Sequence, residues 1–355
     1  MNIWIDICHT PQYNFCANLI RLLAAKGHYV YVTVLSRGRL VNIVNNEMSG
    51  IKNVSIEAIG EHRLTKKSAL WDANIKRVFQ FLHWVRNKHI DMAFSANTIP
   101  CALVCRLKAI PSYVYADDAT RHTYKIVTAL CTNMLNTCVP KEGYFNQDKI
   151  KVLNVLKEWA YLAPKYFHQN VKILNQYGLC PKEYIFLREV SVGTFNYAGQ
   201  AKGCVLAVKD LIDYIKTIDG RKMKVLFSLE EKHRRNEYPE DWILLQEPIE
   251  DIHSLIYYAA GLVSSGDSMA REAALLGIPA YYLGTRHSMP ANLAAAKVAN
   301  LQNELTMPFE KWLGELNEKS VEERMKAQEE LRKKIDEEFI DINAYMMSLV
   351  EKLKE

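Results

Sequence analysis

The sequence predicts two α/β domains, each built around a doubly wound parallel sheet, and three observations indicate this fold class. The chain has 355 residues, which is long for one such domain and comfortable for two. Apolar residues make up 49% and charged residues 24%, a balance that excludes a disordered or fibrous chain. Short β-rich runs alternate with amphipathic helical stretches along most of the sequence, as parallel βαβ units require.

The first half of the chain carries five strand patterns separated by helical ones. The best-defined helix covers residues 14–26, where apolar side chains recur at helical spacing until Gly27 ends the helix. The predicted strands lie at residues 2–7, 29–34, 54–58, 91–95 and 112–115.

The second half repeats this alternation after a hinge, which we expect within residues 157–182 because Pro164 and Pro181 fall there. A polar helical tail at residues 319–355 has an apolar stripe that we expect to pack on the protein, since no heptad persists in it. The predicted strands lie at residues 184–188, 223–228, 242–245, 261–264 and 279–283. We assign residues 1–165 to the first domain, 166–335 to the second and 336–355 to a C-terminal helix, with the option that this helix crosses back to the first domain.

The charge of the chain is +5 overall but unevenly distributed. Residues 1–165 hold 21 Lys and Arg against 11 Asp and Glu, and the remainder holds 24 against 29. This asymmetry indicates that the first domain meets something anionic, such as a phosphate-bearing ligand or a membrane surface; scattered solvated lysines are the alternative. No nucleic-acid recognition motif accompanies the charge, so we expect no nucleic-acid partner.

The cysteine pattern and the N-terminus predict a cytoplasmic protein, with peripheral contact to the inner membrane face as an option. The eight cysteines sit mostly in apolar runs without a C-x-x-C pair, which is typical of reduced core residues. The N-terminus lacks the pattern of a signal peptide, and no run of about 18 apolar residues occurs.

The most informative segment covers residues 262–279, where a short apolar strand gives way to a small-residue turn and then to a helix. The free N–H groups of a helix N-terminus favour an anion, typically phosphate. Ser265, Gly266 and Ser268 are small enough to let a pyrophosphate approach the backbone. Glu272, one turn further on, can accept hydrogen bonds from a ribose diol; alternatively it is a first-turn acid favoured by the helix dipole.

Arg188 follows a strand at the first strand-to-helix turn of the second domain. A guanidinium there can neutralise a departing pyrophosphate in a bidentate manner. The alternative is a surface ion pair with Glu189 or Glu183.

Several spaced motifs carry a family resemblance. The segment S-S-G-D-S-M-A-R-E-A-A-L-L-G-I-P at residues 264–279 resembles the nucleotide-binding loop of GT-B enzymes, which include many glycosyltransferases and the non-hydrolysing UDP-N-acetylglucosamine 2-epimerases. The chain is more closely similar to the GT-B-like family called domain of unknown function 354. The shared motifs are I-D-I-x-x-x-P at residues 5–11, G-H at 27–28, K-E-x-A-Y-L at 157–162, a strand ending in Arg188, and S-L-I-Y-Y-A at 254–259.

The resemblance implies two Rossmann-type domains facing a central cleft, with a nucleotide sugar bound by the second. Carried over residue by residue, it implies that the turn binds the nucleotide diphosphate and that Glu272 binds the ribose. In the family a proline usually follows the arginine at position 188, and Glu189 replaces it here. The nucleotide-sugar-binding candidates are Arg188, Ser265, Gly266, Asp267, Ser268, Met269 and Glu272.

The loop at residues 8–14 lies where GT-B enzymes bring acceptor and donor together. His9 is its only histidine and can act as a general base, since an unperturbed imidazole titrates near neutrality. The family usually has histidines at the positions of Gln12 and Asn14, so either His9 takes over their role or the chemistry differs. The acceptor-side candidates are Thr10, Gln12, Asn14 and Arg121.

The loop at residues 115–122 corresponds to an H-x-E-A-G-x-R segment of the 2-epimerases, whose acid serves in proton abstraction. Asp117 and Asp118 stand in this loop and no glutamate does, which weakens the epimerase interpretation. The two aspartates are catalytic candidates, with a helix cap as the alternative. They do not form the D-x-D that holds a divalent ion, so we expect a metal-independent reaction without a cofactor other than the UDP-sugar substrate.

Residues 62–89 are basic and aromatic, and a helix is expected at residues 71–87. Phe81 and Trp84 lie off its predicted core face and can contact an anionic membrane that carries a lipid-linked acceptor; packing against a neighbouring helix is the alternative. The predicted core face consists of Ile75, Val78, Phe79, Leu82 and Val85.

Three functions are consistent with these patterns. The favoured one is a nucleotide-sugar-dependent glycosyltransferase of glycan or polysaccharide biosynthesis, with the donor in the second domain and a glycan or lipid-linked acceptor in the first. The second is a UDP-sugar 2-epimerase, and the third is a catalytically silent nucleotide-sugar binding protein.

Overall fold

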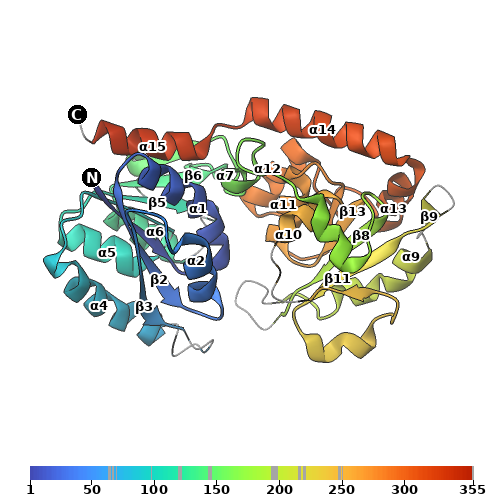
Figure 1. Ribbon diagram of the computed structural model, residues 1–355, viewed down its shortest axis with the longest axis horizontal. Coiled ribbons are helices and arrows are strands. Elements are labelled where there is room, and N and C mark those ends of the chain that lie inside the picture. The colour runs from blue at the N-terminus through green and yellow to red at the C-terminus, as the bar shows by residue number, and fades with distance from the viewer. Residues whose placement is uncertain are drawn as a thin grey trace. The chain divides into compact units, whose positions relative to one another are not determined.

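The computed structural model describes residues 1–62, 65, 68, 70–96, 98–118, 122–142, 146–192, 199–214, 217–218, 221–246, 249 and 251–353. The chain forms two compact units (Figure 1). Unit 1 contains Met1–Tyr161 and Phe339–Glu355, and unit 2 contains Leu162–Glu338. The chain thus passes between the units after Tyr161 and again after Glu338, whereas the sequence predicts breaks after residues 165 and 335.

Unit 1 is built on a seven-stranded parallel sheet with the strand order β3-β2-β1-β4-β5-β6-β7. From β1 the chain adds β2 and β3 on one side and then β4 to β7 on the other, so the sheet is doubly wound. The carboxyl ends of all its strands share one edge. The strands are β1 (Asn2–Ile7), β2 (Tyr29–Ser36), β3 (Val54–Glu61), β4 (Met92–Ala96), β5 (Ser112–Ala116), β6 (Asn133–Thr137) and β7 (Ile150–Leu153). The helices are α1 (Thr10–Ala25), α2 (Leu40–Met48), η1 (Trp71–Lys76), α4 (Arg77–Trp84), η2 (Val85–Asn87), α5 (Ile99–Leu107), α6 (His122–Leu130), η3 (Gln147–Lys149) and α15 (Ile342–Lys352), with the short α7 (Trp159–Leu162) at the first crossing.

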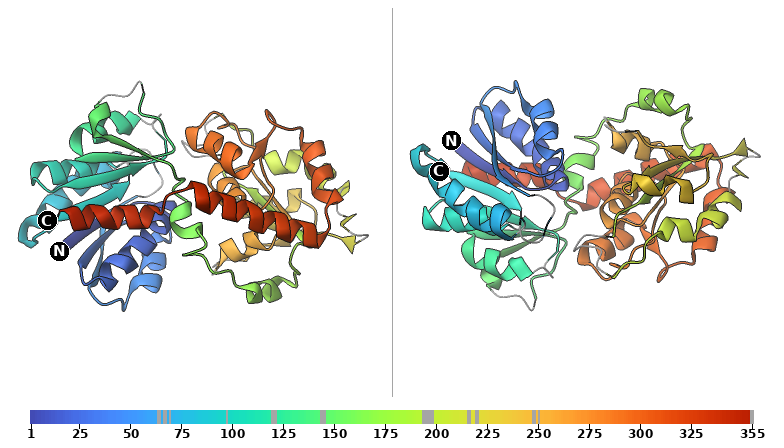
Figure 2. Two further views of the ribbon diagram at one scale, coloured as in Figure 1. Left: turned by 90° about the horizontal axis from the view of Figure 1, so that it is seen from above. Right: turned by 90° about the horizontal axis from the view of Figure 1, so that it is seen from below.

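The C-terminal segment completes unit 1. Helix α15 packs against α1 (Figure 2). The Asn343 side chain donates a 2.8 Å hydrogen bond to the Ala160 carbonyl, and the ring of Trp159 lies 6.0 Å from that of Phe339. The crossing back to the first domain is therefore confirmed.

Unit 2 is built on a six-stranded parallel sheet with the order β12-β11-β8-β13-β14-β15. Strands β8 and β13 are paired so that Arg188 lies beside Ser264 at the carboxyl edge, because the register aligns these two residues. The strands are β8 (Tyr184–Glu189), β11 (Lys224–Leu229), β12 (Ile243–Leu244), β13 (Gly261–Ser264), β14 (Ala280–Tyr282) and β15 (Gln302–Asn303), and β9 (Thr217–Ile218) with β10 (Arg221–Lys222) forms a separate antiparallel pair. The helices are η4 (Val171–Tyr177), α8 (Cys204–Ala207), α9 (Lys209–Tyr214), η6 (Lys232–Glu237), α10 (Ile252–Tyr257), α11 (Asp267–Leu275), α12 (Pro290–Ala299), α13 (Phe309–Glu318) and α14 (Val321–Glu338).

One helix prediction becomes more precise and another was wrong in detail. The helical tail at residues 319–355 consists of two helices, α14 and α15, and the Asp341 side chain caps the second by accepting from the Ala344 N–H at 3.0 Å. The helix at residues 71–87 is rotated relative to the prediction: Phe81 and Trp84 are buried, whereas Ile75 and Phe79 are exposed. It begins with a π-helical turn, η1, which shifts the spacing of the buried positions.

None of the helices in the described part of the chain combines the length and the apolar composition that crossing a bilayer needs.

Candidate functional site

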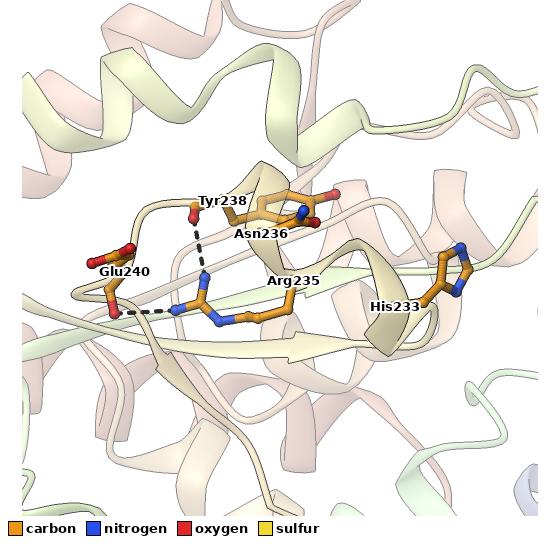
Figure 3. Close-up of a pocket in the computed structure, with 5 residues that line it drawn as sticks. All are labelled: His233, Arg235, Asn236, Tyr238 and Glu240. Atoms are coloured by element: carbon orange, nitrogen blue, oxygen red, sulfur yellow. Dashed lines mark hydrogen bonds between the residues drawn. The ribbon is translucent and has the colours of Figure 1, made fainter.

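A shallow pocket of about 510 Å³ opens on unit 2 around η6 (Figure 3). The Arg235 guanidinium in its wall donates to three backbone carbonyls, those of Tyr238, Glu240 and Trp242, at 2.9–3.1 Å. This side chain therefore stabilises the loop itself. The pocket is lined by His233, Arg235, Asn236, Tyr238 and Glu240, none of which was a predicted site residue.

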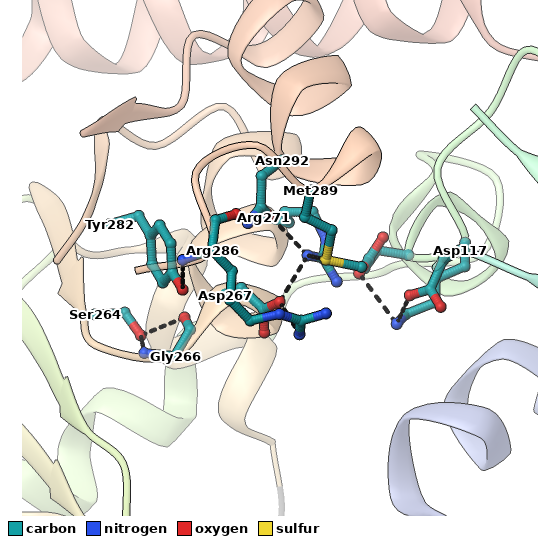
Figure 4. A network of polar contacts seen from close by, with 11 residues as sticks. Asp117, Ser264, Gly266, Asp267, Arg271, Tyr282, Arg286, Met289 and Asn292 are labelled. Carbon is teal, nitrogen blue, oxygen red and sulfur yellow. Dashed lines mark hydrogen bonds and ion pairs between the residues drawn. The ribbon is translucent and has the colours of Figure 1, made fainter. Parts of the chain in front are cut away.

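The turn between β13 and α11 is closed by its own hydrogen bonds (Figure 4). The Ser264 hydroxyl accepts from the Gly266 N–H at 3.0 Å and donates to the Gly266 carbonyl at 2.7 Å. The Ser265 N–H donates to the Arg188 carbonyl at 2.9 Å, and its hydroxyl accepts from the Val190 N–H at 2.9 Å. The N–H groups of Ser265 and Gly266 thus already bond within unit 2.

The predicted binding residues of this turn differ in their access to solvent. Ser265, Gly266 and Asp267 are buried, whereas Ser268 and Met269 in the first turn of α11 are half-exposed. The first N–H groups of a helix find no acceptor within the helix. An anion at this N-terminus would therefore meet the backbone of Ser268 and Met269 rather than that of Ser265.

Asp267 lies between two arginines. Its carboxylate oxygen is 2.8 Å from a guanidinium nitrogen of Arg286 and 3.5 Å from one of Arg271. Asn292 holds both arginines, because its amide oxygen accepts from Arg271 at 2.7 Å and its amide nitrogen donates to the Arg286 carbonyl at 2.8 Å (Figure 4). Asp267 thus holds two guanidinium groups beside the N-terminus of α11.

The sequence analysis missed both arginines. The i, i+4 spacing of Asp267 and Arg271 is a helical ion-pair signal that was available in the sequence. Arg286 follows β14, and loops after parallel strands gather at one sheet edge, so its position was also a usable signal.

Glu272 lies in the second turn of α11, where its carboxylate is nearly buried. The first-turn acid of this helix is Asp267, so the dipole alternative applies to that residue and not to Glu272. One carboxylate oxygen of Glu272 is 3.4 Å from Nε2 of His253 in α10, and the His253 ring packs edge-on to Phe167 at 6.4 Å. The histidine therefore contributes to the orientation of the carboxylate.

Arg188 is held by two partners on the β11 side of unit 2. One guanidinium nitrogen donates to the Ser228 hydroxyl at 2.7 Å, and another forms an ion pair with Glu230. The ion-pair partner is thus Glu230, not Glu189 or Glu183. The Glu230 carboxylate also accepts from the Ser191 N–H at 2.8 Å.

Glu189, which replaces the proline expected after Arg188, is buried and binds α8. Its carboxylate accepts from the Val205 N–H at 2.7 Å and from the Tyr238 hydroxyl at 3.3 Å. Burial raises the pKa of this carboxyl, and the hydrogen bonds it accepts oppose the rise. The N-terminus of α8 is consequently satisfied by an internal acid.

In unit 1, the predicted acceptor loop follows β1. His9 is exposed and precedes α1, and its carbonyl accepts from the N–H groups of Gln12 and Tyr13 at 3.0 and 3.1 Å. The Gln12 side chain accepts from the Cys8 N–H at 2.8 Å, so it stabilises the loop. Thr10 is exposed and Asn14 half-buried.

The buried Arg77 side chain stabilises this loop. The Arg77 guanidinium bonds to the Asp6 carboxylate, to the Cys8 sulfur at 2.8 Å and to the Ile59 carbonyl at 2.8 Å. Burial raises the pKa of the Cys8 thiol to about 12, an effect that Arg77 partly opposes. Cys8 is therefore a neutral thiol near neutrality and not a nucleophile.

Asp117, at the carboxyl end of β5, forms an ion pair with Lys157, whose ammonium also lies 3.8 Å from the Glu158 carboxylate. The K-E pair of the K-E-x-A-Y-L motif thus meets the predicted catalytic aspartate, a relationship that the sequence analysis did not foresee. Asp118 is buried. Arg121 lies outside the described residues.

A family model and a curated relative each cover most of the chain. The model of the family "Protein of unknown function (DUF354)" matches residues 1–290. An uncharacterized protein of Methanocaldococcus jannaschii is 20% identical over 290 residues, which cover 79% of this chain and 80% of the relative.

Solved structures with a similar fold include two kinds of enzyme. The UDP-GlcNAc 2-epimerase from Neisseria meningitidis bound to UDP-GlcNAc has a TM-score of 0.65 and 10% identity, with both chains covered completely (100%). The glycosyltransferase VinC in complex with DTDP has a TM-score of 0.64 and 11% identity, again with 100% of both chains covered. The chain therefore belongs to the DUF354 family of proteins of unknown function, and its two parallel-sheet domains have the GT-B fold of these glycosyltransferases and epimerases.

Proposed function

We propose that this protein is a glycosyltransferase that takes its sugar from a nucleotide sugar, most simply a UDP-sugar, in the synthesis of a glycan or polysaccharide. One observation carries the proposal: the N-terminus of α11 combines half-exposed backbone at Ser268 and Met269 with two guanidinium groups, those of Arg271 and Arg286, held by Asp267 beside it. Proteins of the same fold bind UDP-GlcNAc and DTDP, which supports a nucleotide ligand here.

The donor's diphosphate would accept hydrogen bonds from the first N–H groups of α11 and from the Arg286 guanidinium. The ribose hydroxyls would donate to Glu272, the carboxylate that His253 contacts at 3.4 Å. Arg188 would exchange its ion pair with Glu230 for the departing diphosphate. These preorganised charges would stabilise the leaving group without a metal ion.

The acceptor, a glycan or a lipid-linked sugar, would bind to unit 1 at the carboxyl edge of its sheet. His9, at the start of α1, is the proposed general base that removes the proton from the attacking hydroxyl. Thr10 and Asn14 are proposed acceptor contacts, and Asp118 remains a proposed catalytic group. Asp117 is a poorer base than His9, because its ion pair with Lys157 stabilises the charged carboxylate.

An isomerase is the second candidate, because the similar structures include UDP-GlcNAc 2-epimerases. An epimerase needs an acid or base beside the sugar and no separate acceptor. Asp117 or Asp118 would act there, and the ion pair with Lys157 disfavours Asp117 in this role.

The test begins with binding. UDP, GDP and CMP, each alone and as sugar conjugates, would be titrated calorimetrically into the wild type, Glu272→Gln and the surface control Glu310→Gln. We expect one nucleotide family to bind the wild type and the control equally, and Glu272→Gln to bind at least about tenfold more weakly. Binding of no nucleotide, or equal binding by all three proteins, would refute the proposed site.

The reaction class is then read from the products. The preferred sugar nucleotide is incubated alone and with candidate acceptors, and the products are identified by NMR. Release of free nucleotide that depends on an acceptor supports a transferase, and a 2-epimer formed without an acceptor identifies an isomerase. Binding without either product indicates a nucleotide-sugar binding protein. Unchanged turnover in His9→Ala would remove that residue as the base.

A further inference from the structure

The outward face of η1 and α4 in unit 1 carries an apolar stripe. Leu70, Trp71, Ile75 and Phe79 are 66, 56, 39 and 68% exposed. The last three are spaced four residues apart, so they follow one another along one side of the helix. We call these four residues the η1–α4 stripe.

The opposite side of the same helix explains why the stripe faces outward. Arg77 points inward to its ion pair with Asp6, and the Phe81 ring packs edge-on against Trp4 at 4.9 Å. Phe81 and Trp84 are both buried in the core of unit 1. These contacts fix the rotation of the helix, so the stripe cannot turn inward without breaking a buried ion pair.

Basic side chains lie on the same helical segment as the stripe. Lys76 and Arg86 on the same helical segment are exposed, as is His83. The only acid between residues 70 and 87 is Asp72. Lys88, just beyond, forms an ion pair with Glu57 at 3.4 Å and lies over the Trp84 ring at 4.6 Å. We therefore do not count it among the charges of the stripe.

We propose that the η1–α4 stripe docks on an anionic lipid bilayer. Trp71 and Phe79 enter the interfacial region, where aromatic rings are favoured, and Lys76 and Arg86 face the lipid phosphates. Each cation near an anionic surface contributes about 1 kcal/mol, which adds to the apolar insertion. This docking is independent of the proposed transfer reaction.

Area and charge favour a bilayer over a second copy of the chain. The four side chains expose on the order of 500 Å², the upper range for the largest patch of a monomer. Two copies joined through the stripe would bury roughly 1,000 Å², which is below the size of a stable specific interface. They would also bring Lys76 and Arg86 of both copies together, and these like charges repel.

The experiment is flotation of the full chain with vesicles. We expect binding to vesicles that contain phosphatidylglycerol, little binding to vesicles of phosphatidylcholine alone, and release as the salt is raised to about 1 M. The double variant Trp71→Ser/Phe79→Ser should lose at least about tenfold in affinity for anionic vesicles. Lys76→Glu/Arg86→Glu should lose affinity as well, because its charges now oppose those of the lipid.

Leu293→Ser/Leu305→Ser is the matched control, because these two unit 2 side chains are 57 and 74% exposed. It should bind vesicles as the wild type does. Thermal unfolding of each variant shows whether lost vesicle binding comes from a lost fold. Nucleotide titration of each variant shows whether the proposed nucleotide site is intact. No flotation at low salt, or equal loss in the control, overturns the proposal. A dimer that Trp71→Ser/Phe79→Ser dissociates, without vesicle binding, would assign the stripe to a second copy instead.

Discussion

The Arg77 guanidinium and the Asp6 carboxylate form a two-point ion pair inside unit 1, with nitrogen–oxygen distances of 2.7 and 3.1 Å and both side chains fully buried. Asp6 also accepts from Thr33 at 2.8 Å. The pair joins β1 to α4, two elements far apart in sequence. It thereby supports the loop after β1 at Cys8 and sets the rotation of the helix that carries the η1–α4 stripe.

Replacing Arg77 should destabilise the protein strongly. Arg77→Met leaves the Asp6 carboxylate buried without its counter-charge, which costs about 3–5 kcal/mol. Denaturant unfolding measures the loss. Asp6→Asn/Arg77→Met should recover a large part of it, because no charge then remains buried. If the double variant is as unstable as the single one, the hydrogen bonds of Arg77 to Cys8 and Ile59 matter more than the ion pair.

Lys182 should make stability rise with pH above neutrality. Burial, assisted by the nearby Arg324 charge, lowers the pKa of its ammonium to about 7, against about 10.4 in an unfolded chain. Well below pH 7 both states carry the proton. Between pH 7 and 8.5 the unfolded state binds more protons than the folded state, so the free energy of unfolding increases with pH, by about 1–2 kcal/mol from this group.

The measurement compares unfolding of the wild type with Lys182→Met and the exposed control Lys311→Met at pH 7.0, 7.5, 8.0 and 8.5. Groups common to all three proteins cancel in the comparison. Lys182→Met should show a flatter pH dependence than the other two. Parallel curves for all three would mean that the amine titrates elsewhere.

Arg286 should be needed for nucleotide binding, although its loss should leave the protein folded. Arg286→Gln leaves Asp267 paired with Arg271, so unfolding should change by only about 1–2 kcal/mol. Loss of a charge-assisted hydrogen bond to phosphate should weaken nucleotide binding about tenfold or more. Calorimetry with the nucleotide that the wild type prefers measures this. Arg234→Gln, which removes an ion pair to Glu237 on the same unit, should bind as the wild type does.

Gly277 should tolerate no side chain. Its φ is +78°, and a Cβ there would lie 2.7 Å from the Gln328 carbonyl oxygen of α14. Gly27 has a similar φ of +82° but open space around the corresponding position. Gly27→Ala should therefore cost about 1 kcal/mol for the left-handed backbone, and Gly277→Ala at least about 2 kcal/mol more because α14 must move. Equal costs in thermal unfolding would show that α14 adapts freely.

The parts of the fold that local pattern dictates were predictable, and the strands β1 to β5, β8 and β11 to β14 lie where their apolar runs indicated. Strand β6 was missed because two asparagines, Asn133 and Asn136, interrupt its apolar pattern. Asn136 is tolerated inside because the Tyr124 hydroxyl donates to it at 2.9 Å and its amide nitrogen donates to the Val139 carbonyl at 3.2 Å. These hydrogen bonds depend on partners outside the strand, which strand periodicity does not reveal.

In the candidate site, too, local signals were predictable and contacts between distant residues were not. The β13–α11 turn was identifiable, because small residues between a strand and a helix are a local signal. The inward position of Arg77 was not, since its partner Asp6 lies 71 residues away and a buried arginine contradicts the apolar-face rule that assigned the helix. Glu230 as the partner of Arg188 was likewise set by the pairing of β8 with β11.

The return of the chain to unit 1 also affects the order in which the protein is made. Unit 2 is one continuous stretch, Leu162–Glu338, whereas unit 1 takes its last helix from residues synthesised after that stretch. On the ribosome, unit 1 must wait for the whole of unit 2 before α15 can cover α1. A fragment that stops at Tyr161 would keep this face open permanently, so expression of unit 1 by itself calls for α15 to be joined to it by a linker.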